Sequence, residues 1–257
     1  MNSTIHTLLN HRSISFFKDQ AIPKEDLTTM LEAMNRTATS TGMQMASWIR
    51  VTDPKLKAEL AQVAHQPYLA KVPELFIFIV DLYRNCQIAK AKGYQGSKFR
   101  SMDNFFQGLA DAYLQAQSLT LAAESSGLGA VFFGSILNDP TRVIQLLKLP
   151  ELTFPILGLG MGYPDDQPEK KPRIPVDMKL GENSYPYLAN YDQTFQAYDE
   201  AMSHYYDTRN KNQRSDTFTN QVISKLAQGK KKRAQLMRVV QSQGFDVWLE
   251  DETEYGD

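Results

Sequence analysis

The chain has almost no cysteine and no excess of charge of either sign. Cys86 is the only cysteine among 257 residues, so no intramolecular disulfide can form, and a lone thiol is typical of a reducing compartment. The formal net charge of -1 gives no overall field that would favour nucleic acid or an anionic membrane. The four histidines show no metal-ligand spacing, and the single cysteine supplies no partner ligand.

Long hydrophobic runs are also missing. The longest run, residues 75–80, has the length of a strand and is followed by Asp81, so no segment is expected to span a membrane. The N-terminal residues lack the charged and then apolar order of a secretory signal. We therefore expect a cytoplasmic protein.

Two catalytic signatures are absent as well. Gly127-Leu128-Gly129 follows a predicted helix and precedes a predicted strand, which is the reverse of the order in a dinucleotide-binding loop. Gly127 is better interpreted as a left-handed helix cap. No Gly-x-Ser-x-Gly elbow is present, so hydrolase chemistry lacks support. Any redox chemistry would then depend on an organic cofactor.

Hydrophobic periodicity predicts an α+β fold that is rich in helix. The helix predicted over residues 105–125 carries few charges on any face, so we expect it to be central or to lie in a subunit interface. The runs at 75–80 and 154–162 indicate strands buried on both faces. The other predicted strands are 48–52 and 130–134, and the other predicted helices are 4–10, 23–35, 53–64, one starting at 138–140, 191–206 and 216–243.

We predict one domain over residues 1–245, followed by an acidic tail at 246–257. Within this domain, residues from about 163 to 245 form a proline-rich and then helical C-terminal extension. The segment 90–101 is rich in lysine and glycine, and we expect it to cover a site or to be partly disordered.

Two small cationic clusters, His11-Arg12-Ser13 and Lys171-Pro172-Arg173, are widely separated in the sequence. Arginine offers a planar fork of donors that suits phosphate, and serine adds a short hydrogen bond. A single exposed arginine is usually just a solvated charge, but the two clusters together predict an anion site.

The run Lys230–Arg233 is interpreted as a solvated helix face; nucleic-acid binding is the weaker alternative.

Several segments together resemble the bacterial FMN-dependent nitroreductase superfamily, in its NADPH-preferring nitroreductase and flavin reductase branch. The similarity runs from the N-terminus to about residue 245. It is carried by residues 11–14, 37–44, 123–129, 148–150, 157–162 and 171–175.

This resemblance implies a nitroreductase-like mixed sheet flanked by helices, and a homodimer with the long central helix at its interface. It also implies one FMN per subunit. Arg12, Ser13, Lys171 and Arg173 would hold the FMN phosphate, and His11 would pack beside the phosphate or the ribityl chain. Gln66 would bond the ring, Thr39, Ser40 and Gln44 would lie along its edge, and the backbone of Phe132, Phe133, Gly134 and Ser135 would approach it, with one N–H near N5.

The resemblance further implies that Arg209, with help from Lys211 and Arg214, contacts the 2'-phosphate of NADPH. A plain charged loop is the alternative interpretation of these three residues.

Ser15 departs from the family pattern, in which an arginine usually reaches the polar edge of the flavin. Without that cation the anionic hydroquinone is less favourable, so we expect Ser15 to lower the flavin potential.

The predicted function is reduction of nitroaromatics, quinones or flavins by NADPH through ping-pong hydride transfer. The alternatives are a reductase of free FMN and a flavin-binding protein with little turnover.

Overall fold

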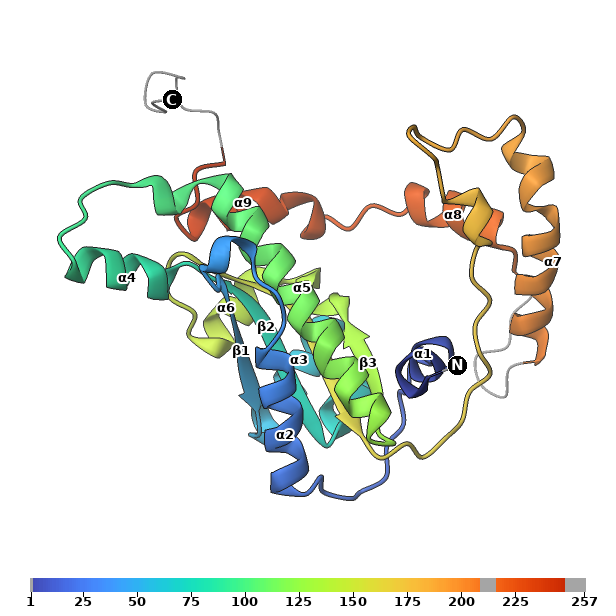
Figure 1. Cartoon of the computed structure of the whole chain (residues 1–257), viewed down its shortest axis with the longest axis horizontal. Helices are drawn as coiled ribbons and strands as arrows, with labels where there is room; N and C mark the ends of the chain where they lie inside the picture. Colours follow the sequence, from blue (N-terminus) through green and yellow to red (C-terminus); the bar gives the residue numbers. More distant parts are fainter. Residues whose placement is uncertain (1, 209–215, 248–257) are drawn as a thin grey trace. The chain divides into compact units, whose positions relative to one another are not determined.

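The computed structural model describes residues 2–208 and 216–247, which fall into two compact units (Figure 1). The first, which we call the sheet unit, contains the chain up to Leu9, residues 13–166 and the chain from Lys230 onward. The second, the helical unit, contains residues 10–12 and 167–229.

The sheet unit is built on four strands in the order β1-β2-β4-β3, and all neighbouring strands are antiparallel. Among the described residues, parallel pairing is limited to isolated bridges such as the one between Ser13 and Ala130. Nearly all of β2 and the whole of β4 are buried, which confirms the prediction of strands covered on both faces. The strands are β1 (Ala46–Val51), β2 (Glu74–Asp81), β3 (Gly129–Phe133) and β4 (Thr153–Gly162).

Helices cover both faces of this sheet. Alternate residues of β2 enter two different hydrophobic clusters: Phe76, Phe78 and Val80 pack in the cluster that contains α2 and α5, whereas Leu75 and Ile77 pack in the cluster that contains α3. This alternation is the period of two expected for a strand. The helices of this unit are α1 (Ser3–Leu9), α2 (Lys24–Asn35), α3 (Pro54–Ala64), α4 (Tyr83–Ala91), α5 (Met102–Ser125), α6 (Pro140–Leu147) and α9 (Leu236–Ser242).

Helix α5 confirms the prediction of a long central helix. Ala112, Ala116 and Leu119 are fully buried against the sheet, whereas Phe106 and Leu114 on the same helix are exposed. Gly127 follows the helix with a φ of 77°, the left-handed geometry that the sequence predicts for a cap. The class is therefore α+β.

The predicted helix 216–243 is wrong. Helix α8 (Phe218–Ala227) ends before Gly229, and α9 begins only at Leu236. Between them, Lys230 and Arg233 donate to the side chain of Asn138, and Lys232 forms an ion pair with Asp139. The basic run thus does not lie on a helix face, because partners near residue 138 hold it in another conformation.

Helix α4 was not predicted as a helix, and it contributes to the site described below. It begins two residues after β2 and ends inside the lysine- and glycine-rich segment, which continues into a short 3-10 turn at Lys98–Arg100.

The helical unit contains α7 (Tyr191–Thr208) and α8. Tyr198, Met202 and Tyr206 of α7 form a small buried cluster. Asp199 receives hydrogen bonds from the backbone N–H and the hydroxyl of Thr219, which joins the two helices. Within the described part of the chain, no helix combines the length and apolar character needed to cross a membrane.

Candidate functional site

Residues 39–47 make a tightly turned segment that leads into β1. Thr41, Gly42 and Gln44 have φ values of 50°, 71° and 51°, and only a glycine adopts this left-handed region without cost. The segment contains Thr39 and Ser40, which with Gln44 were expected along the flavin edge. Such a backbone persists only where its surroundings hold it in place.

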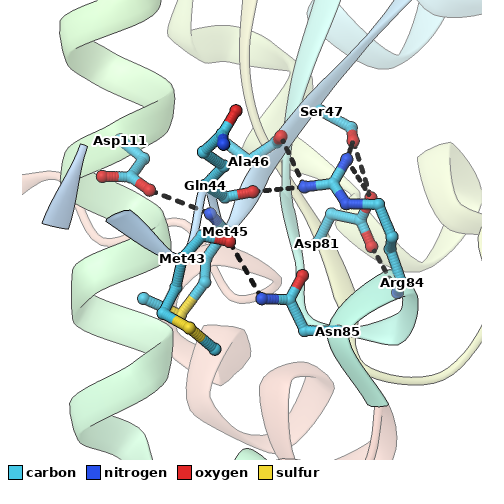
Figure 2. Close-up of polar contacts among 9 residues, drawn as sticks. All are labelled: Met43, Gln44, Met45, Ala46, Ser47, Asp81, Arg84, Asn85 and Asp111. Atoms are coloured by element: carbon cyan, nitrogen blue, oxygen red, sulfur yellow. Dashed lines mark hydrogen bonds and ion pairs between the residues drawn. The ribbon is translucent and has the colours of Figure 1, made fainter. Parts of the chain in front are cut away.

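Asp111 of α5 supplies part of that support. Its carboxylate is fully buried and accepts hydrogen bonds from the backbone N–H of Ser40 at 2.8 Å and of Met45 at 2.9 Å (Figure 2 shows the second). Gly108, one turn earlier, permits the close approach, since a Cβ there would lie 2.7 Å from the Met45 carbonyl oxygen. Hydrogen bonds to a carboxylate are among the strong ones, so α5 fixes both ends of the turn.

Helix α4 holds the same segment at its backbone carbonyls. The guanidinium of Arg84 donates to the carbonyl oxygen of Gln44, and Asn85 Nδ2 donates to that of Met43 at 2.9 Å (Figure 2). Arg84 is itself oriented by Asp81, 3.5 Å away. Side chains of α4 and α5 thus form hydrogen bonds with backbone groups of the turn, while the Gln44 side chain is exposed.

A chain of hydrogen bonds connects three of the residues expected to contact a flavin. Ser135 Oγ donates to Gln66 Oε1, and Gln66 Nε2 donates to the hydroxyl of Tyr68 at 2.9 Å. Burial raises the pKa of Tyr68, and a hydrogen bond between its hydroxyl and Ser15 opposes that rise. Residues 15, 66 and 135 are far apart in the sequence, yet Ser15 and Gln66 both bond Tyr68, and Ser135 is linked to it through Gln66. We call this set the Tyr68 network.

Two features of the fold hold Gln66 and Tyr68 in their positions within this network. Helix α3 ends at His65, whose φ of 53° turns the chain sharply into a 3-10 turn at Pro67–Lys71. The buried ammonium of Lys57 then donates to the carbonyl oxygens of Val72 at 2.8 Å and Pro73 at 2.9 Å. Burial lowers the pKa of Lys57, and these two acceptors compensate for its loss of water.

The end of β3 presents open backbone close in sequence to Ser135. Phe133 is buried whereas the Phe132 side chain is exposed. A Cβ on Gly134 would meet no atom within 4 Å, so a ligand can approach the main chain there. Arg233 Nη1 donates to the Gly134 carbonyl oxygen at 3.1 Å and steadies this turn. The geometry suits the expected approach of a flat ring to residues 132–135.

The second basic cluster and two of the three residues of the first belong to the helical unit. Residues 10–12, which include His11 and Arg12, group with the segment that contains Lys171 and Arg173. Lys170 Nζ donates to Asn10 Oδ1 at 3.2 Å, which ties the two segments together. Ser13, the third member of the first cluster, lies in the sheet unit.

Helix α7 holds the second cluster. The hydroxyl of Tyr198 donates to the Pro172 carbonyl oxygen at 3.2 Å, and the Lys171 ammonium lies 5.7 Å from the centre of the Tyr206 ring. Burial raises the pKa of Tyr198, and the charge of Arg173 opposes this rise. Aromatic side chains therefore position cations that remain exposed and able to bind an anion.

Arg209, Lys211 and Arg214, the residues expected at the NADPH 2'-phosphate, lie outside the described residues. Among the residues the structure does describe, no three His, Cys, Asp or Glu side chains gather as metal ligands.

Residues 8–163 match the Nitroreductase family, and residues 171–247 match the Nitroreductase family, C-terminal domain. An FMN reductase (NADPH) from Bacillus subtilis (strain 168) is 37% identical over 249 residues, which covers 96% of this chain and 99% of that protein. An oxygen-insensitive NADPH nitroreductase from Salmonella typhimurium is 32% identical over 246 residues, with coverage of 95% and 99%. The structure of an NADPH:FMN oxidoreductase from Vibrio harveyi complexed with NAD+ has a TM-score of 0.85 at 34% identity, with coverage of 95% and 99%.

The chain therefore belongs to the nitroreductase family. The resemblance noted from residues 11–14, 123–129 and 171–175 is confirmed over almost the whole chain.

Sequence reasoning did not identify Asp111, Arg84 or Tyr68. Asp111 does leave a signal, because a lone carboxylate on the apolar face of a helix must find hydrogen-bond partners when buried. Arg84 and Tyr68 leave none, since each sits in an ordinary sequence context and acquires its role only from contacts made after folding.

Replacing Asp111 with alanine tests its support of residues 40–45. We expect a loss of about 2–4 kcal/mol in the free energy of unfolding, because two buried N–H groups lose a charged acceptor. Urea unfolding followed by circular dichroism measures this. Asp103→Ala on the same helix removes an exposed carboxylate bonded to Gln107 and is the control, with an expected loss below about 1 kcal/mol. Equal losses in the two variants would contradict the anchoring role.

Proposed function

We propose that the protein is an FMN-dependent oxidoreductase that uses NADPH to reduce nitroaromatics, quinones or flavins. The observation that carries this proposal is the Tyr68 network, which gathers Ser15, Gln66 and Ser135 beside open backbone at Gly134. The names of the relatives, FMN reductase (NADPH) and NADPH nitroreductase, support it. Bound FMN would supply hydride transfer at N5, first from the nicotinamide and then to the acceptor.

The residues present suit the two ends of FMN. Arg12, Lys171 and Arg173 offer charge and a planar donor fork to a phosphate. The Tyr68 network offers neutral hydroxyl and amide groups to the polar atoms of a ring, and Gly134 lets a ring reach the main chain. No side chain is needed as a nucleophile, because the residues of the chain only bind, orient and stabilise.

A homodimer is part of this proposal. Phe106, Tyr113 and Leu114 are large apolar side chains on α5 that remain exposed in a single chain, and a subunit interface would bury them. Arg209, Lys211 and Arg214 are proposed to bind the NADPH 2'-phosphate, and a cytoplasmic location is proposed from the lone cysteine.

Steady-state kinetics test the function. We expect parallel double-reciprocal lines with NADPH and a quinone or nitroaromatic, as ping-pong exchange requires, and a higher kcat/KM for NADPH than for NADH. A rate measurable only with free FMN as the acceptor would favour a dedicated flavin reductase. The absence of turnover with any of these acceptors, despite bound flavin, would leave a binding protein.

The phosphate role of Arg173 is tested by comparing two flavins. Arg173→Ala should weaken FMN binding by about 10–100-fold, the scale of a charged hydrogen bond, and leave riboflavin binding unchanged because riboflavin has no phosphate. Quenching of flavin fluorescence gives both dissociation constants. Lys179→Ala, which removes another exposed cation of the helical unit, is the control. A similar loss of affinity for both flavins would refute a phosphate contact.

Ser15 is tested by restoring the cation that relatives usually carry there. Ser15→Arg should raise the flavin midpoint potential, because a charge near the ring stabilises the anionic reduced form by about 1–3 kcal/mol. Spectroelectrochemical titration measures the potential. Ser15→Ala, which removes the hydroxyl without adding charge, is the control for the lost contact with Tyr68. No rise in the arginine variant relative to the alanine variant would sink the idea.

A further inference from the structure

Helix α4 and the turn that follows it carry charge of one sign only. Residues 84–100, which we call the α4 segment, contain no aspartate or glutamate. Their cations are Arg84, Lys90, Lys92, Lys98 and Arg100, and the three lysines are exposed. Within the described residues, Lys90 and Lys92 form no ion pair. The α4 segment therefore presents a positive surface suited to an acidic partner.

The α4 segment folds back on itself around Phe99. The Phe99 ring lies 6.4 Å from that of Tyr94, and the Lys90 ammonium lies 5.9 Å from its centre. Phe99 in turn packs against the hydrophobic cluster that contains α2 and α5. These contacts bring Lys90, near the end of α4, close to the neighbour of Arg100, although ten positions separate Lys90 from Arg100 in the sequence.

The chain that follows α9 reaches the α4 segment at this point. Phe245 is buried, with its ring 5.0 Å from that of Phe105. The backbone N–H of Asp246 donates to the Arg100 carbonyl oxygen at 2.9 Å, and the Asp246 carboxylate forms an ion pair with the Arg100 guanidinium at 3.1 Å. The first carboxylate of the acidic tail 246–257 is therefore already paired with the last cation of the α4 segment.

The rest of the tail, residues 248–257, carries the charge that the α4 segment lacks. It contains no lysine or arginine, and its acidic residues are Glu250, Asp251, Glu252, Glu254 and Asp257. It lies beyond residue 247, where the match to the nitroreductase family ends. Ten extended residues reach about 33 Å, whereas α4 is only about 14 Å long. The tail is thus long enough to follow the whole of α4.

We propose that residues 248–257 dock on the α4 segment of the same chain, where their carboxylates pair with Lys90, Lys92 and Lys98. A single exposed ion pair contributes little to stability. This contact is intramolecular, however, because Asp246 holds the start of the tail beside Arg100. Such a tether gives the remaining carboxylates an effective concentration in roughly the millimolar range.

The docked tail is a strap that stabilises α4. This helix supplies Arg84 and Asn85, which donate to the backbone carbonyls of Gln44 and Met43 in the turn at residues 39–47. The strap therefore supports the candidate site from outside it. The inference does not depend on the proposed function, and its tests require neither flavin nor turnover.

Zero-length cross-linking with a carbodiimide tests docking in the full chain. This reagent joins a lysine to a carboxylate that it contacts, and mass spectrometry identifies the joined peptides. We expect links from the tail to the lysines of the α4 segment at low ionic strength, and about a tenfold fall in 1 M NaCl, where the screening length is about 3 Å. Lys55 is the internal control and should form no such links. It is exposed and follows β1, whose last residue pairs with the start of β2, whereas α4 follows the end of β2.

Isotope labelling decides whose tail is bound. Chains with and without nitrogen-15 are unfolded and refolded together before cross-linking. Docking within one chain gives links whose two peptides are both labelled or both unlabelled. Links that join a labelled peptide to an unlabelled one would place the tail on a second copy and would overturn the assignment to the same chain.

Charge reversal tests the effect on α4. Hydrogen exchange of the α4 amides should become about three- to tenfold faster when the charges of the tail are reversed, because the strap no longer opposes local opening. The changes are Glu250→Lys, Asp251→Lys and Glu252→Lys. Reversing the lysines of the α4 segment should have the same effect, through Lys90→Glu, Lys92→Glu and Lys98→Glu. A chain that carries both sets should return to wild-type exchange, since opposite charges face each other again. Lys55→Glu is the control and should leave α4 unchanged.

Three results would overturn the inference. The first is an unchanged exchange rate after reversal of the tail charges. The second is a chain with both sets of reversals that exchanges as fast as either set alone, because the charges would then act independently. The third is a tail that forms no cross-links while the α4 segment retains a soluble polyanion such as heparin, which would assign this surface to an external partner. Each of these results leaves the proposed function untouched.

Discussion

The buried carboxylate of Asp111 is the constraint on which the candidate site depends. It lies on the buried and mostly apolar face of α5, and taking a carboxylate out of water is costly unless its oxygens are hydrogen-bonded. The N–H groups of Ser40 and Met45 meet that need, and in return they hold a turn that contains three left-handed residues. Helix and turn therefore stabilise each other, and the first residues of β1 start from a fixed point.

The charged and the neutral residues proposed to bind FMN belong to different units. The cations proposed for the FMN phosphate belong to the helical unit, whereas the Tyr68 network of the sheet unit consists of neutral hydroxyl and amide groups. Affinity for FMN and the potential of its ring would thus depend on different residues. With serine at position 15, we propose that the ring environment would be set by hydrogen-bond donors rather than by a full charge.

The sequence predicted those parts of the fold that depend on local pattern. The buried runs of β2 and β4, the apolar face of α5 and the cap at Gly127 follow from residue spacing alone. The break between α8 and α9 did not, because the partners of Lys230 and Arg233 lie near residue 138. The candidate residues Ser15, Gln66 and Ser135 came from resemblance to a family. Their connection to Tyr68 depends on long-range contacts, such as the one between Ser135 and Gln66, which lie 69 positions apart in the sequence, and periodicity does not encode these contacts.

The central claim is that this fold binds FMN and passes electrons from NADPH through it. Its most direct test is the visible absorption spectrum of the purified protein, reconstituted with FMN and then mixed with NADPH in the absence of oxygen. We predict a bound-flavin band that is bleached by stoichiometric NADPH and restored by a quinone. A band that persists after NADPH is added, or a protein that retains no flavin, would contradict it.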